Sequence, residues 1–122
     1  MNNLFCSSGK FFKGPLEKKW MGNFLNGEVT LTENYLILDN NPSYLIGTKT
    51  TKPIKFEIPI QNIENAYTTR HQLIYILHLD TKDENIYSIG FQTQFDKGNK
   101  KINELKELLK QLIPNLTFYK PK

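Results

Sequence analysis

Cysteine, arginine and long apolar runs are all scarce in this sequence. Cys6 is the only cysteine, so neither an intramolecular disulfide nor a zinc site built on cysteine ligands can form. No stretch approaches the roughly 18 consecutive apolar residues of a membrane-spanning helix. Residues 1–10 also lack the apolar core of a signal peptide. We therefore expect one domain located in the reducing environment of the cytoplasm.

The shortage of arginine also limits the kind of partner. The formal net charge is +4, and Arg70 is the only arginine among the 16 basic residues. Lysine gives a diffuse positive field, whereas base reading and two-pronged phosphate binding favour arginine. The composition thus favours attraction to an anionic surface and argues against sequence-specific nucleic-acid binding.

Alternating apolar and polar residues predict about seven short strands. The clearest hairpin joins residues 28–32 to residues 35–38 through a two-residue turn at Glu33-Asn34. The other predicted strands are residues 10–20, 54–60, 63–69, 73–79 and 86–91. The first is expected at a sheet edge because it contains Pro15. Residues 39–53 are rich in turn-forming residues and are predicted to form a long loop.

The apolar period changes to that of a helix near the C-terminus. Asp96 is the predicted N-cap and Pro114 the stop. The apolar positions at helical spacing are Ile102, Leu105, Leu108, Leu109, Leu112 and Ile113. The chain is therefore predicted to be mainly β with one C-terminal α-helix. We divide it into a flexible N-terminus (1–9), a folded domain (10–113) and a C-terminal tail (114–122).

No group of residues predicts catalysis, a metal site or a cofactor. His71 lies in a predicted turn and His78 shares a strand face with isoleucines, so both are predicted to be structural or solvent-facing. The acidic residues around Asp80 lack the glycine and final glutamate of a calcium loop. A glycine-rich phosphate loop is also absent from the sequence. We expect a protein that is not an enzyme.

One segment combines cationic and large apolar side chains. It consists of Lys18, Lys19, Trp20, Met21, Phe24 and Leu25, within residues 18–25. Lysine charge can meet lipid headgroups while aromatic and aliphatic side chains enter the membrane boundary. The alternative is that these apolar side chains fill the protein core.

A second segment has three lysines and no acidic residue between them. Lys49, Lys52 and Lys55 lie within seven positions at the end of the predicted long loop. An exposed lysine near an anionic membrane contributes on the order of 1 kcal/mol, so three would give weak, salt-sensitive attraction. Alternatively, they are ordinary charges that maintain solubility.

The order of elements resembles the pleckstrin-homology-like superfamily, in particular its GRAM and bacterial PH-like branches. The resemblance spans roughly residues 11 to 113. It rests on the hairpin from Gly27-Glu28-Val29-Thr30-Leu31-Thr32 to Tyr35-Leu36-Ile37-Leu38, on Ile58-Pro59-Ile60 with Ile63, and on the later hairpin and closing helix.

This resemblance implies a seven-stranded, partly open antiparallel barrel capped by the helix. In such folds the loops after the first, third and sixth strands share one rim, which family members use for phosphoinositides or other anionic lipids. That rim would gather Lys18, Lys19, Lys49, Lys52 and Lys82. The sequence departs from the phosphoinositide-binding pattern because the expected basic-x-arginine ending of the second strand is missing.

Two functions from different classes follow. The first is a binding module that associates weakly with anionic membrane lipid or a membrane-bound partner through its lysines and aromatic residues. Its location would then include the membrane periphery. The second is a protein-interaction or scaffold domain that accepts a peptide at a sheet edge or beside the helix.

Overall fold

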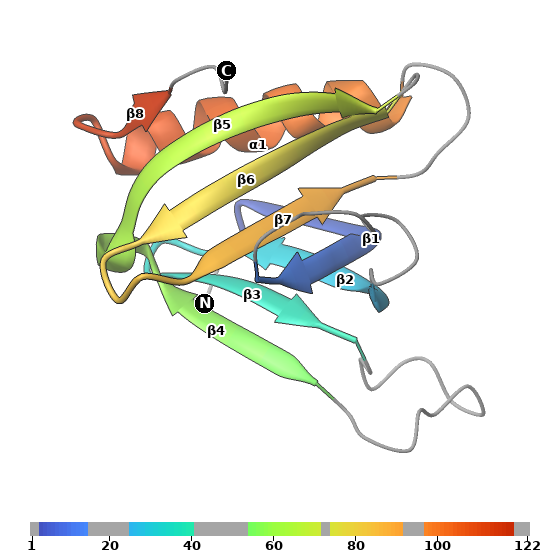
Figure 1. Ribbon diagram of the computed structural model, residues 1–122, viewed down its shortest axis with the longest axis horizontal. Helices are drawn as coiled ribbons and strands as arrows, with labels where there is room; N and C mark the ends of the chain where they lie inside the picture. Colours follow the sequence, from blue (N-terminus) through green and yellow to red (C-terminus); the bar gives the residue numbers. More distant parts are fainter. Residues whose placement is uncertain (1–2, 15–24, 41–53, 72–73, 92–96, 119–122) are drawn as a thin grey trace.

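One sheet and one helix make up the described part of the chain (Figure 1). The structure, a computed structural model, describes residues 3–14, 25–40, 54–71, 74–91 and 97–118. The strands are β1 (Phe5–Lys13), β2 (Leu25–Leu31), β3 (Tyr35–Asp39), β4 (Lys55–Pro59), β5 (Ile63–His71), β6 (Ile74–Thr81), β7 (Ile86–Gly90) and β8 (Thr117–Phe118). A 3₁₀ turn, η1 (Ile60–Asn62), follows β4, and the helix α1 (Lys97–Leu112) precedes β8.

The strands form one curved sheet in the order β4-β3-β2-β1-β7-β6-β5-β8. The long β1 connects its two halves, because its first part pairs with β2 and its residues Lys10 to Lys13 pair with β7. The end strands β4 and β8 are not paired with each other, so the sheet stays open. A mainly antiparallel, partly open sheet with one C-terminal helix confirms the predicted fold class.

The first strand differs from the prediction in both its start and its place. β1 begins at Phe5 rather than at Lys10, so residues 5–9, predicted to belong to a flexible N-terminus, pair with β2. It lies in the middle of the sheet and not at an edge. Phe5 explains the difference, because it is 6% exposed and packs edge-to-face on Phe91 with ring centres 5.5 Å apart. This contact anchors a segment that otherwise holds only small residues.

The predicted hairpin between β2 and β3 is confirmed. Its turn lies at residues 33 and 34, and the Thr32 hydroxyl accepts hydrogen bonds from the N–H groups of Asn34 (3.3 Å) and Tyr35 (3.0 Å). The Thr32 N–H donates to the Tyr35 carbonyl at 2.8 Å. A threonine that satisfies turn N–H groups in this way fixes the register of both strands.

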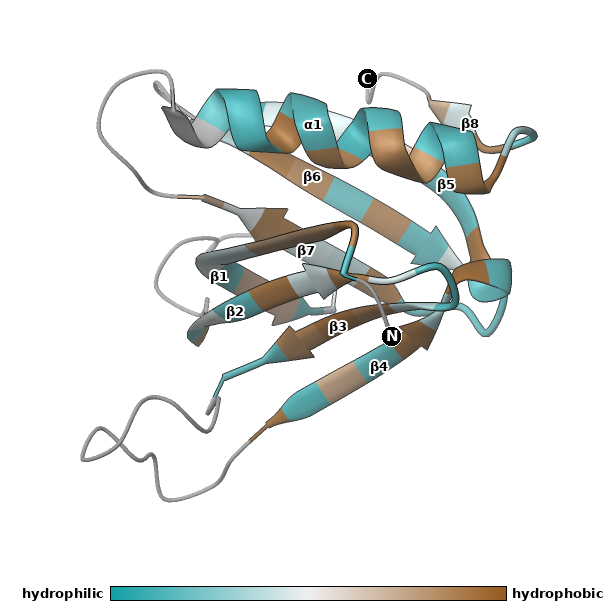
Figure 2. Cartoon of the chain, turned by 180° about the vertical axis from the view of Figure 1, so that it is seen from behind, coloured by the Kyte–Doolittle hydropathy of each residue, from teal (hydrophilic) through white to brown (hydrophobic). Residues whose placement is uncertain are grey.

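The apolar stripe of α1 closes the core. Ile102, Leu105 and Leu109 are fully buried and belong to the same cluster as Leu77 and Leu79 of β6. Figure 2 shows the hydrophobic side of α1 facing the sheet and its hydrophilic side facing outward. The helix therefore caps the sheet as predicted, through side chains three and four positions apart.

The end of the chain adds an element that the sequence did not predict. α1 ends at Leu112, just before Pro114, as predicted, and the predicted N-cap, Asp96, lies outside the described residues. Beyond the helix, Thr117–Phe118 form β8, which pairs parallel with β5. Part of the predicted tail therefore extends the sheet to eight strands. The adjacent Leu116 is buried in the core, which holds this short strand in place.

Candidate functional site

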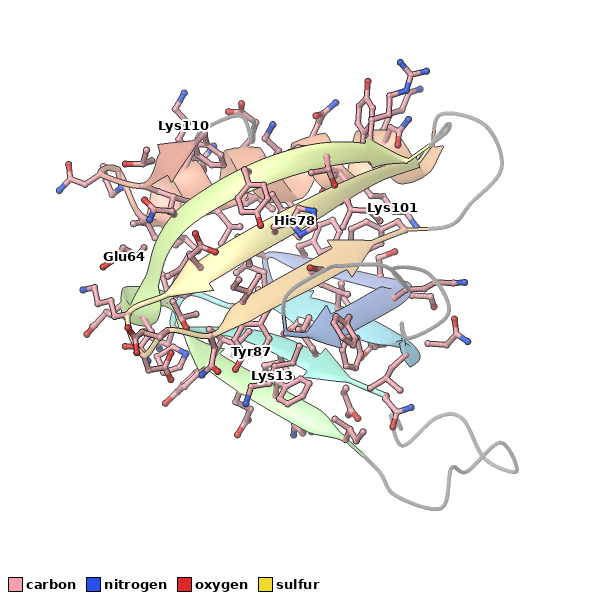
Figure 3. All side chains as sticks on the ribbon, in the orientation of Figure 1. Lys13, Glu64, His78, Tyr87, Lys101 and Lys110 are labelled. Atoms are coloured by element: carbon pink, nitrogen blue, oxygen red, sulfur yellow. The ribbon has the colours of Figure 1, made fainter. Side chains whose placement is uncertain are left out.

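The end of β1 presents an ammonium group that two aromatic rings hold in position. Alternation along β1 places Lys13 on the same side of the strand as the buried Phe11. Lys13 is exposed, and its Nζ lies 5.5 Å from the centre of the Phe56 ring and 5.9 Å from that of Tyr87. Both distances suit cation–π attraction. The charge is thus fixed beside Tyr87 and remains open to solvent (Figure 3).

The two rings also join the halves of the sheet. Phe56 comes from β4 and Tyr87 from β7, and their rings meet edge-to-face with centres 5.5 Å apart. Phe56 also meets Phe11 edge-to-face at 6.0 Å. Burial raises the pKa of Tyr87, and the negative charge of Asp83 raises it further, so the phenol stays neutral at physiological pH. The aromatic side chains therefore form a rigid, uncharged support for Lys13.

The turn between β6 and β7 supplies charges of both signs beside Lys13. Its residues Lys82, Asp83 and Glu84 are exposed. The Thr81 hydroxyl donates to the Asp83 carboxylate, and this bond is the main cause that lowers the pKa of Asp83, with a smaller contribution from the charge of Lys13. The carboxylate is thus ionised at physiological pH. The two lysines and two acids of this region sum to no net charge, so strong anion binding needs further cations.

A segment that carries two of the predicted lysines begins beside Lys13. Residues 15–24 leave the sheet at Gly14, whose N–H donates to the Ile86 carbonyl at 2.7 Å. They return at Leu25, which lies opposite Phe11. Gly14 has a φ of +128°, a conformation that glycine adopts without strain. The β1 end, the start of β7 and the root of this segment are therefore neighbours.

The second lysine-bearing segment is rooted at the same end of β2. Residues 41–53 leave the sheet at Asn40 and return at Ile54. The Asn40 N–H donates to the Ile54 carbonyl (2.9 Å), and the Asn40 side-chain oxygen accepts from the Ile54 N–H (3.1 Å). Asp39 lies opposite Glu28, close along β2 to the return of the first segment. Leu25, Asn40 and Ile54 therefore lie at one end of the β1–β4 half of the sheet, whereas Lys82 lies beyond the other end of β4, where its N–H donates to the Asn62 carbonyl at 2.8 Å (Figure 1).

Most of the predicted site residues fall within these two segments. Outside the described residues lie Lys18, Lys19, Trp20, Met21, Phe24, Lys49 and Lys52. Lys82 is exposed in the β6–β7 turn, next to Asp83, and so belongs to the Lys13 region. Leu25 is half-buried and packs against the core, which fits the alternative that its segment contributes apolar side chains to the core.

Lys55 lies on the other side of β4. Its neighbour Phe56 points inward to Lys13, so alternation directs Lys55 to the outer face of the sheet. There its Nζ lies 3.9 Å from Oε2 of Glu57, with both side chains more than half exposed. A surface ion pair of this kind contributes little to stability. The structure therefore does not bring Lys55 together with Lys13 and Lys82.

Lys13 is not among the site residues predicted from the sequence. Residues 10–20 read as one strand, which gives Lys13 no special place. The usable signal is Gly14-Pro15, which follows it directly. Glycine and proline in succession favour a turn, so this pair marks Lys13 as the last residue of its strand and hence as a residue at the end of the sheet.

His78 is buried with hydrogen bonds to both ring nitrogens. It is 1% exposed, its Nδ1 lies 2.8 Å from the Ser88 hydroxyl, and its Nε2 lies 2.7 Å from the Thr69 hydroxyl. The Tyr67 ring stacks on it with centres 4.5 Å apart. Ser88 is fully buried too, so a substrate cannot reach this pair in the folded state. This arrangement fits the structural role predicted for His78.

Other candidates for chemistry are few in the described residues. Cys6 is exposed on β1 and accepts a hydrogen bond from the Thr30 hydroxyl at 3.6 Å. The side chain of His71 is not among those that the structure describes. Within the described ranges, no three histidine, cysteine or carboxylate side chains come together as metal ligands. A helix with the length and apolarity needed to cross a membrane is also missing from those ranges.

The two edges of the sheet differ in whether their backbone groups are available to a partner strand. On the helix side, β8 already pairs with β5 at Asn65 and Ala66, so the chain itself occupies that stretch of the edge beside α1. On the other side, β4 bonds to β3 through its even-numbered residues, as the Asn40–Ile54 bond shows. The backbone groups of Lys55 and Glu57 therefore point away from β3.

Comparisons with known proteins identify the fold through structure alone. No protein-family model and no curated protein sequence matches the chain. It is similar to a chain of the Spt16D–Pob3N heterodimer, with a TM-score of 0.58 and 15% identity over 99% of its own length and 58% of the other. It is also similar to the Slm1 PH domain solved with inositol 4-phosphate, with a TM-score of 0.52 and 12% identity over 92% and 97% of the two chains.

These similarities cover nearly the whole of the present chain, although it spans only 58% of the first relative. At such low identity they establish the arrangement of the backbone and no more. The narrower resemblance to the GRAM and bacterial branches stays a prediction. Together with the strand order and the capping helix, they show that the chain has a pleckstrin-homology-like fold.

Proposed function

We propose that this domain is a non-enzymatic module that attaches to anionic membrane surfaces. The attachment uses the Lys13 site, which comprises Lys13, Lys82 and the segment 15–24, and is assisted by the segment 41–53 at the other end of β4. The observation that carries the proposal is the position of Lys13. Its ammonium is held over Phe56 and Tyr87, open to solvent, beside the root of the first lysine-bearing segment.

The two segments supply the positive charge that the described residues lack. They contain four lysines, Lys18, Lys19, Lys49 and Lys52, against one acid, Glu17. At about 1 kcal/mol for each lysine near an anionic leaflet, this excess gives reversible attachment and not a tight complex. Trp20, Met21 and Phe24 add apolar contact with the membrane boundary in this proposal.

The choice of ligand follows from charge and from the fold. Lysines spread over two segments give a diffuse field, which suits a charged surface better than one rigidly bound phosphate. The similar Slm1 domain was solved with inositol 4-phosphate, which supports an anionic headgroup as the kind of ligand. The present domain would be located in the cytoplasm and attach to the periphery of membranes.

A protein-interaction function is the second candidate. The open β4 edge favours it, because the backbone groups of Lys55 and Glu57 can accept an added strand. The short length of β4, its ion pair and its terminal Pro59 oppose it, since these features protect edges from pairing. A peptide beside the helix is less favoured, because β8 occupies part of the β5 edge.

Replacing Lys13 by glutamine should lower binding to anionic vesicles about fivefold, as expected for the loss of roughly 1 kcal/mol. The measurement is sedimentation with phosphatidylserine-containing vesicles at low ionic strength. Lys110→Gln is the matched control, because Lys110 is exposed on α1 at a distance from Lys13 (Figure 3). It should bind as wild type does.

Three outcomes would contradict the proposal. Equal sedimentation of the wild-type protein with neutral and with anionic vesicles would remove the electrostatic basis of the proposal. Equal losses for the Lys13 and Lys110 variants would show a non-specific charge effect. Failure of the wild type to bind anionic vesicles at low salt would leave the protein-interaction function in first place.

A further inference from the structure

The side of the β1–β4 half of the sheet that faces away from the core carries exposed and half-buried side chains around two buried threonines. Strand register arranges these residues in rows that run across the four strands. The first row is Leu4, Thr32, Tyr35 and Pro59; the second is Cys6, Thr30, Ile37 and Glu57; the third is Ser8, Glu28, Asp39 and Lys55. We use "outer face" for these three rows.

The first row contains two exposed apolar side chains. Leu4 and Tyr35, at 36% and 40% exposure, are the only large hydrophobic side chains that are exposed in the described ranges. Thr32 lies between them and is only 2% exposed. Pro59 is exposed directly opposite Tyr35, and Ile37 is half-buried in the next row. Exposed apolar residues that gather on one face suggest a binding surface.

The charge of the outer face is opposite to that of the whole chain. Glu28 and Asp39 lie directly opposite each other, and Glu57 stands in the neighbouring row. Lys55 lies directly opposite Asp39, so the three rows hold three acidic residues and one basic residue. Lys55 is the only lysine in the three rows, whereas the chain carries a net charge of +4.

We propose that the outer face binds a partner protein through a lysine- or arginine-rich segment that carries an aliphatic or aromatic anchor. The anchor contacts Tyr35 and its apolar neighbours, and the basic residues meet Glu28, Asp39 and Glu57. Complementary charge gives such a contact its specificity and speed of association.

Two other occupants fit the charge pattern less well. An anionic membrane would meet three carboxylates, so it is repelled from this face. A second copy in a two-fold dimer would place the same carboxylates against each other. The proposal does not depend on the Lys13 site, because Phe56 points inward from β4 to Lys13, whereas Glu57 points outward.

The test compares the binding of two synthetic peptides to the full chain. One contains lysine, leucine and a single tryptophan, and the other has glutamate in place of every lysine. We expect the lysine peptide to bind at least about tenfold more tightly by fluorescence anisotropy, since hot-spot contacts and charge complementarity act together. In the isotope-labelled protein, it should shift the backbone amide signals of Tyr35, Ile37 and Glu57.

Two substitutions separate the apolar and charged contributions. Tyr35→Ser should weaken binding of the lysine peptide about tenfold without lowering the melting temperature, because Tyr35 is exposed. Glu57→Lys should weaken it by a similar factor. Glu104→Lys on the exposed side of α1 makes the same charge change elsewhere and should leave binding unchanged.

The proposal is overturned if neither peptide binds or if both bind equally. It is also overturned if the signal changes fall on α1 or on the β6–β7 turn and not on the outer face. A dimer that sedimentation detects and Tyr35→Ser abolishes would show that a second copy is the occupant. Vesicle binding in the same samples gives a separate reading of the Lys13 site, because Tyr35→Ser should not change it.

Discussion

Replacement of Leu109 by alanine should lower the free energy of unfolding by about 2 to 5 kcal/mol. Leu109 is fully buried and packs in the core with Ile102 and Leu105 of the same helix. Truncation removes apolar contact between α1 and the sheet and leaves a cavity that the rigid sheet cannot fill. Urea unfolding, followed by circular dichroism, measures the change.

The adjacent exposed residue provides the control. Lys110→Ala keeps the helix propensity high and removes no buried side chain, so it should change the free energy of unfolding by less than about 0.5 kcal/mol. If Leu109→Ala has an equally small effect, the helix does not pack on the sheet as described. A predominantly helical circular dichroism spectrum of the wild type would contradict the fold itself.

Replacement of Gly27 by alanine should destabilise the domain by about 1 to 3 kcal/mol, the usual cost of placing a side chain where none fits. A Cβ atom at Gly27 would lie 2.2 Å from the Asp39 carbonyl oxygen and 2.8 Å from Cα of Asn40. Both are backbone atoms, so the strands themselves would have to move apart. Thermal unfolding of the variant tests this prediction.

The same substitution should disturb the root of the segment 41–53. Asn40 holds that root through its bonds to Ile54, so the backbone amide signals of both residues should shift in Gly27→Ala. Ser8→Ala is the control, because Ser8 is an exposed position on β1. We expect no loss of stability there beyond about 0.5 kcal/mol. A Gly27 variant as stable as the Ser8 variant would show that β2 and β3 do not approach so closely.

The hairpin and the helix could be predicted because their patterns are local. Alternation around the turn at residues 33 and 34 determines which side chains face the core, and the stripe from Ile102 to Ile113 repeats at helical spacing. Both signals arise within a dozen or so residues of sequence. Each element therefore appeared in the structure close to its predicted bounds.

The elements that were missed depend on contacts between residues far apart in sequence. Residues 5–9 form a strand because Phe5 packs on Phe91 and the segment pairs with β2. No local pattern in residues 5–9 predicts these two contacts. β8 forms in the same way, since Leu116 enters a core that the rest of the chain has built. Local β-propensity predicts short strands poorly when tertiary contacts hold them in place.

The candidate site shows a similar division. Its lysines could be counted from the sequence, but their grouping depends on sheet topology. Lys55 and Phe56 are neighbours in sequence and point to opposite faces of β4, so only one of them belongs with Lys13. Lys13 could not be predicted as a site residue, because the position of its ammonium group depends on the rings of Phe56 and Tyr87. These rings come from β4 and β7, which are distant in sequence.

The most direct test of the central claim is a map of the membrane-binding surface. Isotope-labelled protein is mixed with lipid nanodiscs that contain phosphatidylserine, and the backbone amide signals are recorded at low and at physiological salt. We expect the largest changes at Lys13, Gly14 and Ile86, and we expect them to fade as the Debye length shortens to about 8 Å. Changes centred on α1 or on the outer face around Tyr35, or no change at low salt, would contradict it.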